Sequence, residues 1–175
     1  MTDVRQSART SAQLFAAGAT VLGGLLMVAF SFGPWMRLSV RGADVATTDS
    51  VMLDGWGGTL PGGGEYGASR PAAWTVGLGV FLLLAGLFLV IRRSTVAAGL
   101  SLIVAVIAVV TVIVFLANPE ASFGFNELAN RDQLYVSTEA CLWGVFFGAL
   151  AAAVGLLSVL WPGVTVQGPR TRAGA

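Results

Sequence analysis

Four long stretches of the chain contain no Asp, Glu, Lys or Arg. They run through residues 12–32, 73–91, 95–117 and 140–161. An α-helix rises about 1.5 Å per residue, so about 20 residues cross the roughly 30 Å hydrocarbon core of a bilayer. Stretches of this length are too long for core strands, and a backbone in lipid must satisfy its own hydrogen bonds. The pattern predicts an all-α integral membrane protein, a bundle of four transmembrane helices in a single domain over residues 1–175.

The composition agrees with this prediction and removes most catalytic chemistry. Hydrophobic residues make up 55% of the chain and charged residues 11%, whereas soluble domains are about 25% charged. Histidine is absent and Cys141 is the single cysteine, which excludes His/Cys metal sites, Ser-His and Cys-His nucleophile pairs and an intrachain disulfide. The net charge of +1 gives no basic surface for nucleic acid. We therefore expect no catalytic residue, cofactor, metal site or nucleic-acid partner.

The arginines indicate how the chain is threaded. The N-terminal tail, the connection between the second and third helices and the C-terminal tail each carry two, namely Arg5, Arg9, Arg92, Arg93, Arg170 and Arg172. Residues 33–72 hold four acidic residues and three arginines, and residues 118–139 hold four and one, for net charges of −1 and −3. Because positive loops stay cytoplasmic, we expect both termini in the cytoplasm and these two loops outside. All basic residues are Arg, which suggests GC-rich coding and a bacterial plasma membrane.

The first stretch has a second interpretation. Arg5 and Arg9 before an apolar run also describe a secretory signal, with residues 29–31 as the cleavage site. The run is longer than a usual signal core and ends in aromatic residues, which favours a retained helix. Cleavage would leave three helices with the same loops outside.

The first outer loop has the pattern of a half-exposed strand. Over residues 35–41, Met36, Leu38 and Val40 alternate with Trp35, Arg37, Ser39 and Arg41. Residues 42–44 offer a turn, and residues 45–53 can return as a second strand. The sequence predicts a small extracytoplasmic β-hairpin after the first helix. In the second outer loop we expect a short helix over residues 126–135.

Two features of the outer loops are candidate binding sites. Trp35, Arg37 and Arg41 together could bind an anionic headgroup or a glycan phosphate through charge and stacking, although a solvated strand face is the alternative. Trp56 stands among glycines and could anchor a partner, or it could cap the hairpin. In the first outer loop Asp44, Asp49, Asp54 and Glu65 could hold a divalent cation, but their spacing matches no EF-hand loop. In the second outer loop Glu127, Asp132 and Glu139 could act as a general acid and base only if the fold brings them together over a substrate.

Small residues recur every four positions in two of the helices. The fourth helix has Gly144, Gly148 and Ala152, and the first has Ala16, Thr20 and Gly24. Such stripes let helix backbones approach closely in lipid. They are interpreted as contacts within the bundle, with a dimer or partner interface as the alternative. The third helix is rich in Val and Ile, so we expect it to have the larger lipid-facing surface.

No span contains an ionisable residue. Buried charges persist in membranes mainly for ion pathways, proton relays and voltage sensing, so their absence argues against a pump, a proton-coupled carrier or a voltage sensor. The few hydroxyls in the spans can each bond the carbonyl four residues earlier, and so they do not indicate a pore.

The layout resembles a known family. A Pro34-Trp35 pair after the first helix, Trp56 in a Gly-rich outer loop, an Arg92-Arg93 hairpin and a longer outer loop before the fourth helix are similar to small four-helix membrane proteins associated with tryptophan operons in high-GC Gram-positive bacteria. The resemblance covers the layout of the chain rather than its letters, and the family has no established activity to carry over.

Elimination leaves three functional hypotheses. The first is a non-catalytic accessory or scaffold subunit of a larger membrane or envelope complex, with the lipid bilayer and a larger membrane protein or a second copy as partners. The second is an oligomeric transport component for a small apolar or lipidic substrate. The third is a membrane enzyme on lipid-linked substrates, which requires Asp49, Asp54, Glu127 and Asp132 to converge.

Overall fold

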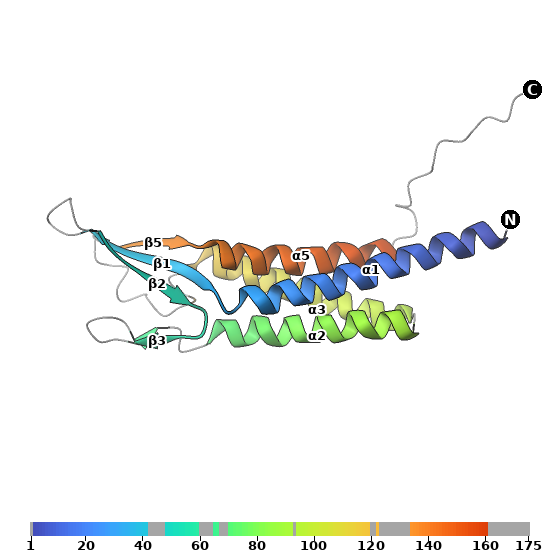
Figure 1. The fold of residues 1–175 in the computed structure, drawn as a ribbon, viewed down its shortest axis with the longest axis horizontal. Coiled ribbons are helices and arrows are strands. Elements are labelled where there is room, and N and C mark those ends of the chain that lie inside the picture. The colour runs from blue at the N-terminus through green and yellow to red at the C-terminus, as the bar shows by residue number, and fades with distance from the viewer. Residues whose placement is uncertain are drawn as a thin grey trace, which may run out of the picture.

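Four long apolar helices dominate the structure, a computed structural model that describes residues 2–41, 48–59, 65–66, 70–92, 94–119, 122 and 134–160. The helices are α1 (Thr2–Phe30), α2 (Pro71–Arg92), α3 (Thr95–Ala117) and α5 (Ala140–Leu160). Each includes a segment long and apolar enough to cross a membrane. They lie along one common axis, with a small sheet at one end of the bundle, here called the sheet end, and the N-terminus at the other (Figure 1). The four predicted helices are confirmed.

The helix boundaries follow local sequence rather than apolarity alone. α1 begins at Thr2 instead of residue 12, because the polar first residues continue the helix beyond the apolar stretch. α2 begins at Pro71, whose fixed φ and missing N–H suit the first helical position. α3 has its predicted bounds, and the Ser94 hydroxyl caps it by accepting a hydrogen bond from the Ala97 N–H at 3.3 Å.

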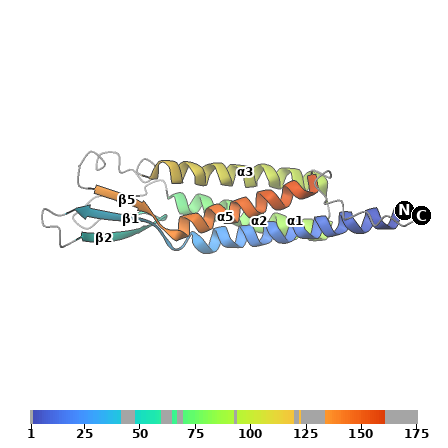
Figure 2. The ribbon, with the colours of Figure 1, turned by 90° about the horizontal axis from the view of Figure 1, so that it is seen from above.

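α1 packs against two of the other three helices. It lies between α5 and α2 (Figure 1), whereas α3 lies mainly against α5 (Figure 2). Two adjacent glycines of α1, Gly23 and Gly24, allow these two close helix contacts. A Cβ on Gly23 would collide with the carbonyl oxygen of Gly148 in α5, and one on Gly24 would lie 2.5 Å from the carbonyl oxygen of Gly79 in α2.

The sheet has three antiparallel strands rather than two. β1 (Pro34–Arg41) lies between β2 (Thr48–Asp54) and β5 (Leu134–Thr138), and a separate short ladder pairs β3 (Gly58–Thr59) with β4 (Glu65–Tyr66). The predicted pairing of β1 with β2 is confirmed. The helix expected over residues 126–135 is wrong at its last two residues, because Leu134 and Tyr135 pair with Val40 and Ser39 in the ladder. Its other residues lie outside the described part of the chain.

The first residues of β1 do not follow the predicted alternation. The register between β1 and β2 shifts between Pro34 and Met36, and such an irregularity lets two consecutive side chains point inward. Trp35 and Met36 are both 0% exposed, and Leu38 is also buried. The prediction that Trp35 shares an exposed face with Arg37 is therefore wrong. The Trp35 ring instead lies 6.0 Å from the ring of Phe115 at the end of α3.

Candidate functional site

The sheet is joined to the helices on both sides of β1. The loop between α1 and β1 spans residues 31–33, and residue 139 alone separates β5 from α5. The Glu139 backbone N–H donates a 2.8 Å hydrogen bond to the Trp35 carbonyl, and the Glu139 carboxylate lies 2.8 Å from Arg37 Nε. This ion pair links the middle strand to the start of α5. The side chains are 41% and 23% exposed, respectively, so water partly screens the pair.

Trp56 forms a second connection between the sheet and the bundle. Its backbone N–H donates to Asp54 Oδ1 at 3.0 Å, closing the turn after β2, and its indole N–H donates to the Ser31 carbonyl at 3.1 Å. Its ring stacks on Phe32 with centroids 5.3 Å apart. Trp56 therefore acts within the chain as a cap at the end of α1. A role as partner anchor remains a prediction.

A buried pair of hydroxyls holds α1 and α2 together at the same level. Ser31 Oγ and Thr75 Oγ1 are 2.7 Å apart. Ser31 Oγ also lies 2.6 Å from the Met27 carbonyl, and Thr75 Oγ1 lies 3.0 Å from the Ala72 carbonyl. Each hydroxyl has one proton to donate, so only two of these three short oxygen–oxygen contacts can be hydrogen bonds at any one time. The pair stabilises the helix contact and leaves no free donor for a ligand.

The four predicted binding residues do not form one surface. Trp35 is buried, and Trp56 is bonded to the end of α1. Arg37 is half-exposed but already faces Glu139. Arg41 lies in β1, and its side chain is outside the described part of the structure. Among the side chains described, Arg37 and Trp56 are the partly exposed members of this set.

The acidic residues give no cation or acid–base site in the described part of the chain, which contains no group of three or more His, Cys, Asp or Glu able to hold a metal. Asp54 accepts the N–H of Trp56, and Glu139 faces Arg37. The remaining predicted acidic side chains lie outside the described residues, namely those of Asp44, Asp49, Glu65, Glu127 and Asp132. Whether any of them converge stays a prediction.

The hydroxyls within the spans bond backbone carbonyls of their own helices. Thr20, Ser31, Ser101 and Thr111 each bond the carbonyl four residues earlier, and Thr75 and Ser158 bond the one three residues earlier. The bond to the fourth preceding carbonyl, expected from the sequence, is thus found for four of these hydroxyls, and the other two bond one residue closer.

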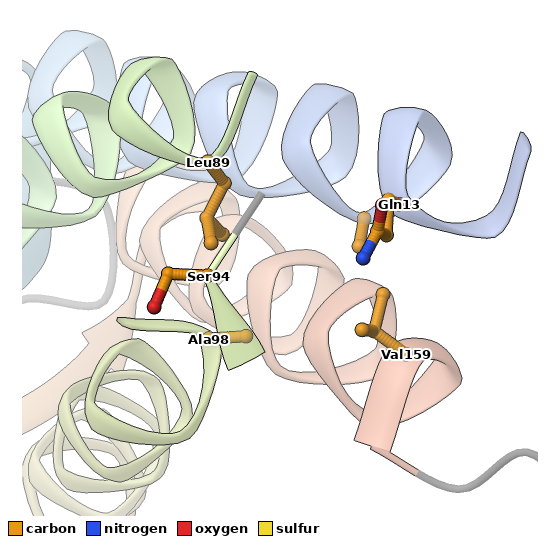
Figure 3. A pocket seen from close by; sticks show the side chains of 6 residues that line it. Gln13, Leu89, Ser94, Ala98 and Val159 are labelled. Carbon is orange, nitrogen blue, oxygen red and sulfur yellow. The ribbon is translucent and has the colours of Figure 1, made fainter. Parts of the chain in front are cut away.

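A small cavity lies where the four helices meet, at the end of the bundle away from the sheet (Figure 3). Its walls are Gln13, Ala16, Leu89, Ser94, Ala98 and Val159, and its volume is about 10 Å³. This is room for about one water molecule. The cavity is too small for an organic substrate.

The predicted small-residue stripe lies in the contact between α1 and α5. A Cβ on Gly148 would lie 2.8 Å from the Gly23 carbonyl oxygen, and one on Gly144 would collide with the ring of Phe30. Ala152 is fully buried. These residues therefore serve packing within one chain. Their partner Gly23 was not singled out from the sequence, although the adjacent Gly23-Gly24 pair was a visible signal.

Comparison with known proteins adds no relative. No family model matches this chain, and no curated protein is similar to it in sequence. The resemblance to the tryptophan-operon membrane proteins therefore stays a prediction from layout.

Proposed function

We propose that this chain is a non-catalytic, multi-pass protein of the bacterial plasma membrane, and that it serves as an accessory or scaffold subunit of a larger membrane or envelope complex. The main support is the close attachment of the sheet to the helices. The Arg37–Glu139 ion pair and the buried Trp35, whose ring lies against Phe115, join β1 to α5 and α3. The Trp56–Ser31 hydrogen bond joins the turn after β2 to the end of α1. A sheet held in this way presents a fixed surface above the membrane to a partner.

The charge distribution supports an extracytoplasmic sheet. Both strands that flank β1 belong to the connections with net charges of −1 and −3, and the arginine-rich segments lie in the other connections. The positive-inside rule then assigns the sheet end to the outside and both termini to the cytoplasm.

A partner needs an exposed apolar contact on the sheet, and Met52 offers one. Its side chain is 57% exposed on β2, directly opposite Arg37 in the ladder. Exposed methionine next to arginine is typical of protein–protein contacts, where both residue types are enriched.

The test is purification of the tagged chain at its natural expression level in native nanodiscs, followed by mass spectrometry of bound proteins. The proposal expects one large partner in stoichiometric amount, and Met52→Ala should lower its yield several-fold. Leu84→Ala is the matched control. Leu84 is a similarly exposed apolar side chain, at 59%, but it lies thirteen residues along α2 from the sheet end of that helix. The control should leave the yield unchanged.

Recovery of the chain alone, or with itself and lipid only, would overturn the accessory role. It would favour the oligomeric transport component for an apolar or lipidic substrate.

A further inference from the structure

The tryptophans of the described chain fall into two groups. Trp35 is 0% exposed and Trp56 donates its indole N–H to Ser31. Trp74 and Trp143, by contrast, are 67% and 44% exposed. Within the described residues, neither of their indole N–H groups has a hydrogen-bond acceptor. Contacts within the chain account for the first group, whereas much of each ring in the second group stays exposed.

The two exposed tryptophans lie at the same depth on different helices. Trp74 is three residues from the first residue of α2, and Trp143 is three residues from the first residue of α5. At 1.5 Å per residue each lies about 4.5 Å inside the sheet end of its helix. Phe32, 64% exposed, lies two residues after the last residue of α1, at the same end. We call Phe32, Trp74 and Trp143 the aromatic rim.

We propose that the aromatic rim contacts the phospholipid bilayer at the boundary between headgroups and acyl chains, and so sets the depth of the protein. This inference rests on the proposed membrane location. An indole has an apolar ring and a polar N–H, and this combination is stable where one side is hydrocarbon and the other is wet.

The surroundings of the rim favour lipid over a protein partner. On the side of the rim away from the sheet, exposed large apolar side chains continue along all four helices, among them Leu22, Leu84, Ile107 and Phe147. A protein partner would cover one side of this surface, whereas a bilayer surrounds it. The indole of Trp143 also packs on Phe146 and Phe147, with centroids 6.0 and 6.3 Å away, so the rim is continuous with the apolar surface.

The proposed depth has a consequence for the ion pair. Glu139 precedes Trp143 by four residues, about 6 Å along the helix axis. The Arg37–Glu139 pair then lies at the level of the lipid headgroups, and the sheet beyond it stands in water.

Depth-dependent fluorescence quenching tests the inference. The parent variant keeps Trp35, which is shielded, and replaces the other four tryptophans by Phe. Trp74, Trp143 or Trp56 is then restored one at a time in vesicles of phosphatidylcholine and phosphatidylglycerol. Lipids carry a spin label either at the headgroup or deep in the acyl chain. We expect Trp74 and Trp143 to be quenched to the same extent, and several-fold more by the shallow label than by the deep one.

Leu84→Trp in the same parent separates the two hypotheses, because residue 84 lies ten residues further along α2 than Trp74. Strong quenching of this indole by the deep label shows that the bundle spans the bilayer. If the deep label quenches the indole at residue 84 but neither label quenches Trp74 and Trp143, the proposed lipid contact of the aromatic rim is overturned and the membrane location stands. Absence of quenching at residue 84 as well would overturn the membrane location on which the inference rests.

Discussion

Two glycines of α1 allow a direct test of how the bundle is held together. Gly23 and Gly18 are in the same helix, and Gly→Ala is the same chemical change at both. A Cβ on Gly23 would collide with the Gly148 carbonyl oxygen and lie 2.9 Å from the Cβ of Ala152. A Cβ on Gly18 would meet nothing within 4 Å. Gly18→Ala is therefore the matched control for Gly23→Ala.

The expected magnitudes follow from these distances. Overpacking an ordered interior costs about 1–3 kcal/mol, and Gly23 belongs at the upper end because the obstructing atom is backbone and cannot change rotamer. Alanine regains up to about 1 kcal/mol over glycine in a helix. The free energy of unfolding should fall by about 2 kcal/mol for Gly23→Ala and stay unchanged or rise by up to about 1 kcal/mol for Gly18→Ala.

Reversible unfolding in mixed detergent micelles, followed by helix circular dichroism, measures both variants against the natural chain. If the two variants have the same free energy of unfolding, the close backbone contact between α1 and α5 is refuted. A loss confined to Gly18→Ala would show that the exposed side of α1 is covered instead.

Three further sets of variants test the connections at the sheet end. Trp35→Ala should lower the free energy of unfolding by about 3–5 kcal/mol, since it empties a fully buried aromatic site; a loss below about 1 kcal/mol in thermal or denaturant unfolding would contradict its burial. Ser31→Ala and Thr75→Val should each cost about 1 kcal/mol, and the double variant less than the sum, because the two hydroxyls share one hydrogen bond. Arg37→Gln should cost at most about 1 kcal/mol and abolish any salt dependence due to the Glu139 pair, as measured by unfolding at low and high ionic strength.

The helices were predictable because the signal for each one lies within its own segment of the sequence. Uncharged stretches of membrane length need no information from the rest of the chain, and α3 has its predicted bounds. The start of α1 was missed because hydropathy marks only the apolar part of a helix, and polar residues can extend the helix beyond it. The apolar stretch marks where lipid is expected rather than where the backbone hydrogen bonds begin.

The sheet was only half predictable because its pairing is long-range. β1 and β2 are close in sequence and alternate visibly, but β5 pairs with β1 from nearly a hundred residues away. Its five residues are too few to distinguish a strand from a helix by periodicity. Trp35 was assigned to the wrong face because the shift in register at Pro34 breaks the alternation. No local pattern indicates which residue such a shift will turn inward.

The direction of the strands limits how copies of this chain can assemble. The strands of the sheet run along the same axis as the helices (Figure 1, Figure 2). Antiparallel pairing of one edge strand with its own copy needs a two-fold axis perpendicular to the strands. In a membrane that axis would lie in the bilayer plane, and the second copy would be inserted upside down. Neighbouring copies with the same topology are thus prevented by symmetry from fusing their sheets in this way, although both outer strands of the sheet are edges. In a bilayer, a common orientation of the copies would thus exclude this edge pairing, which soluble proteins prevent with charged or proline-bearing edges.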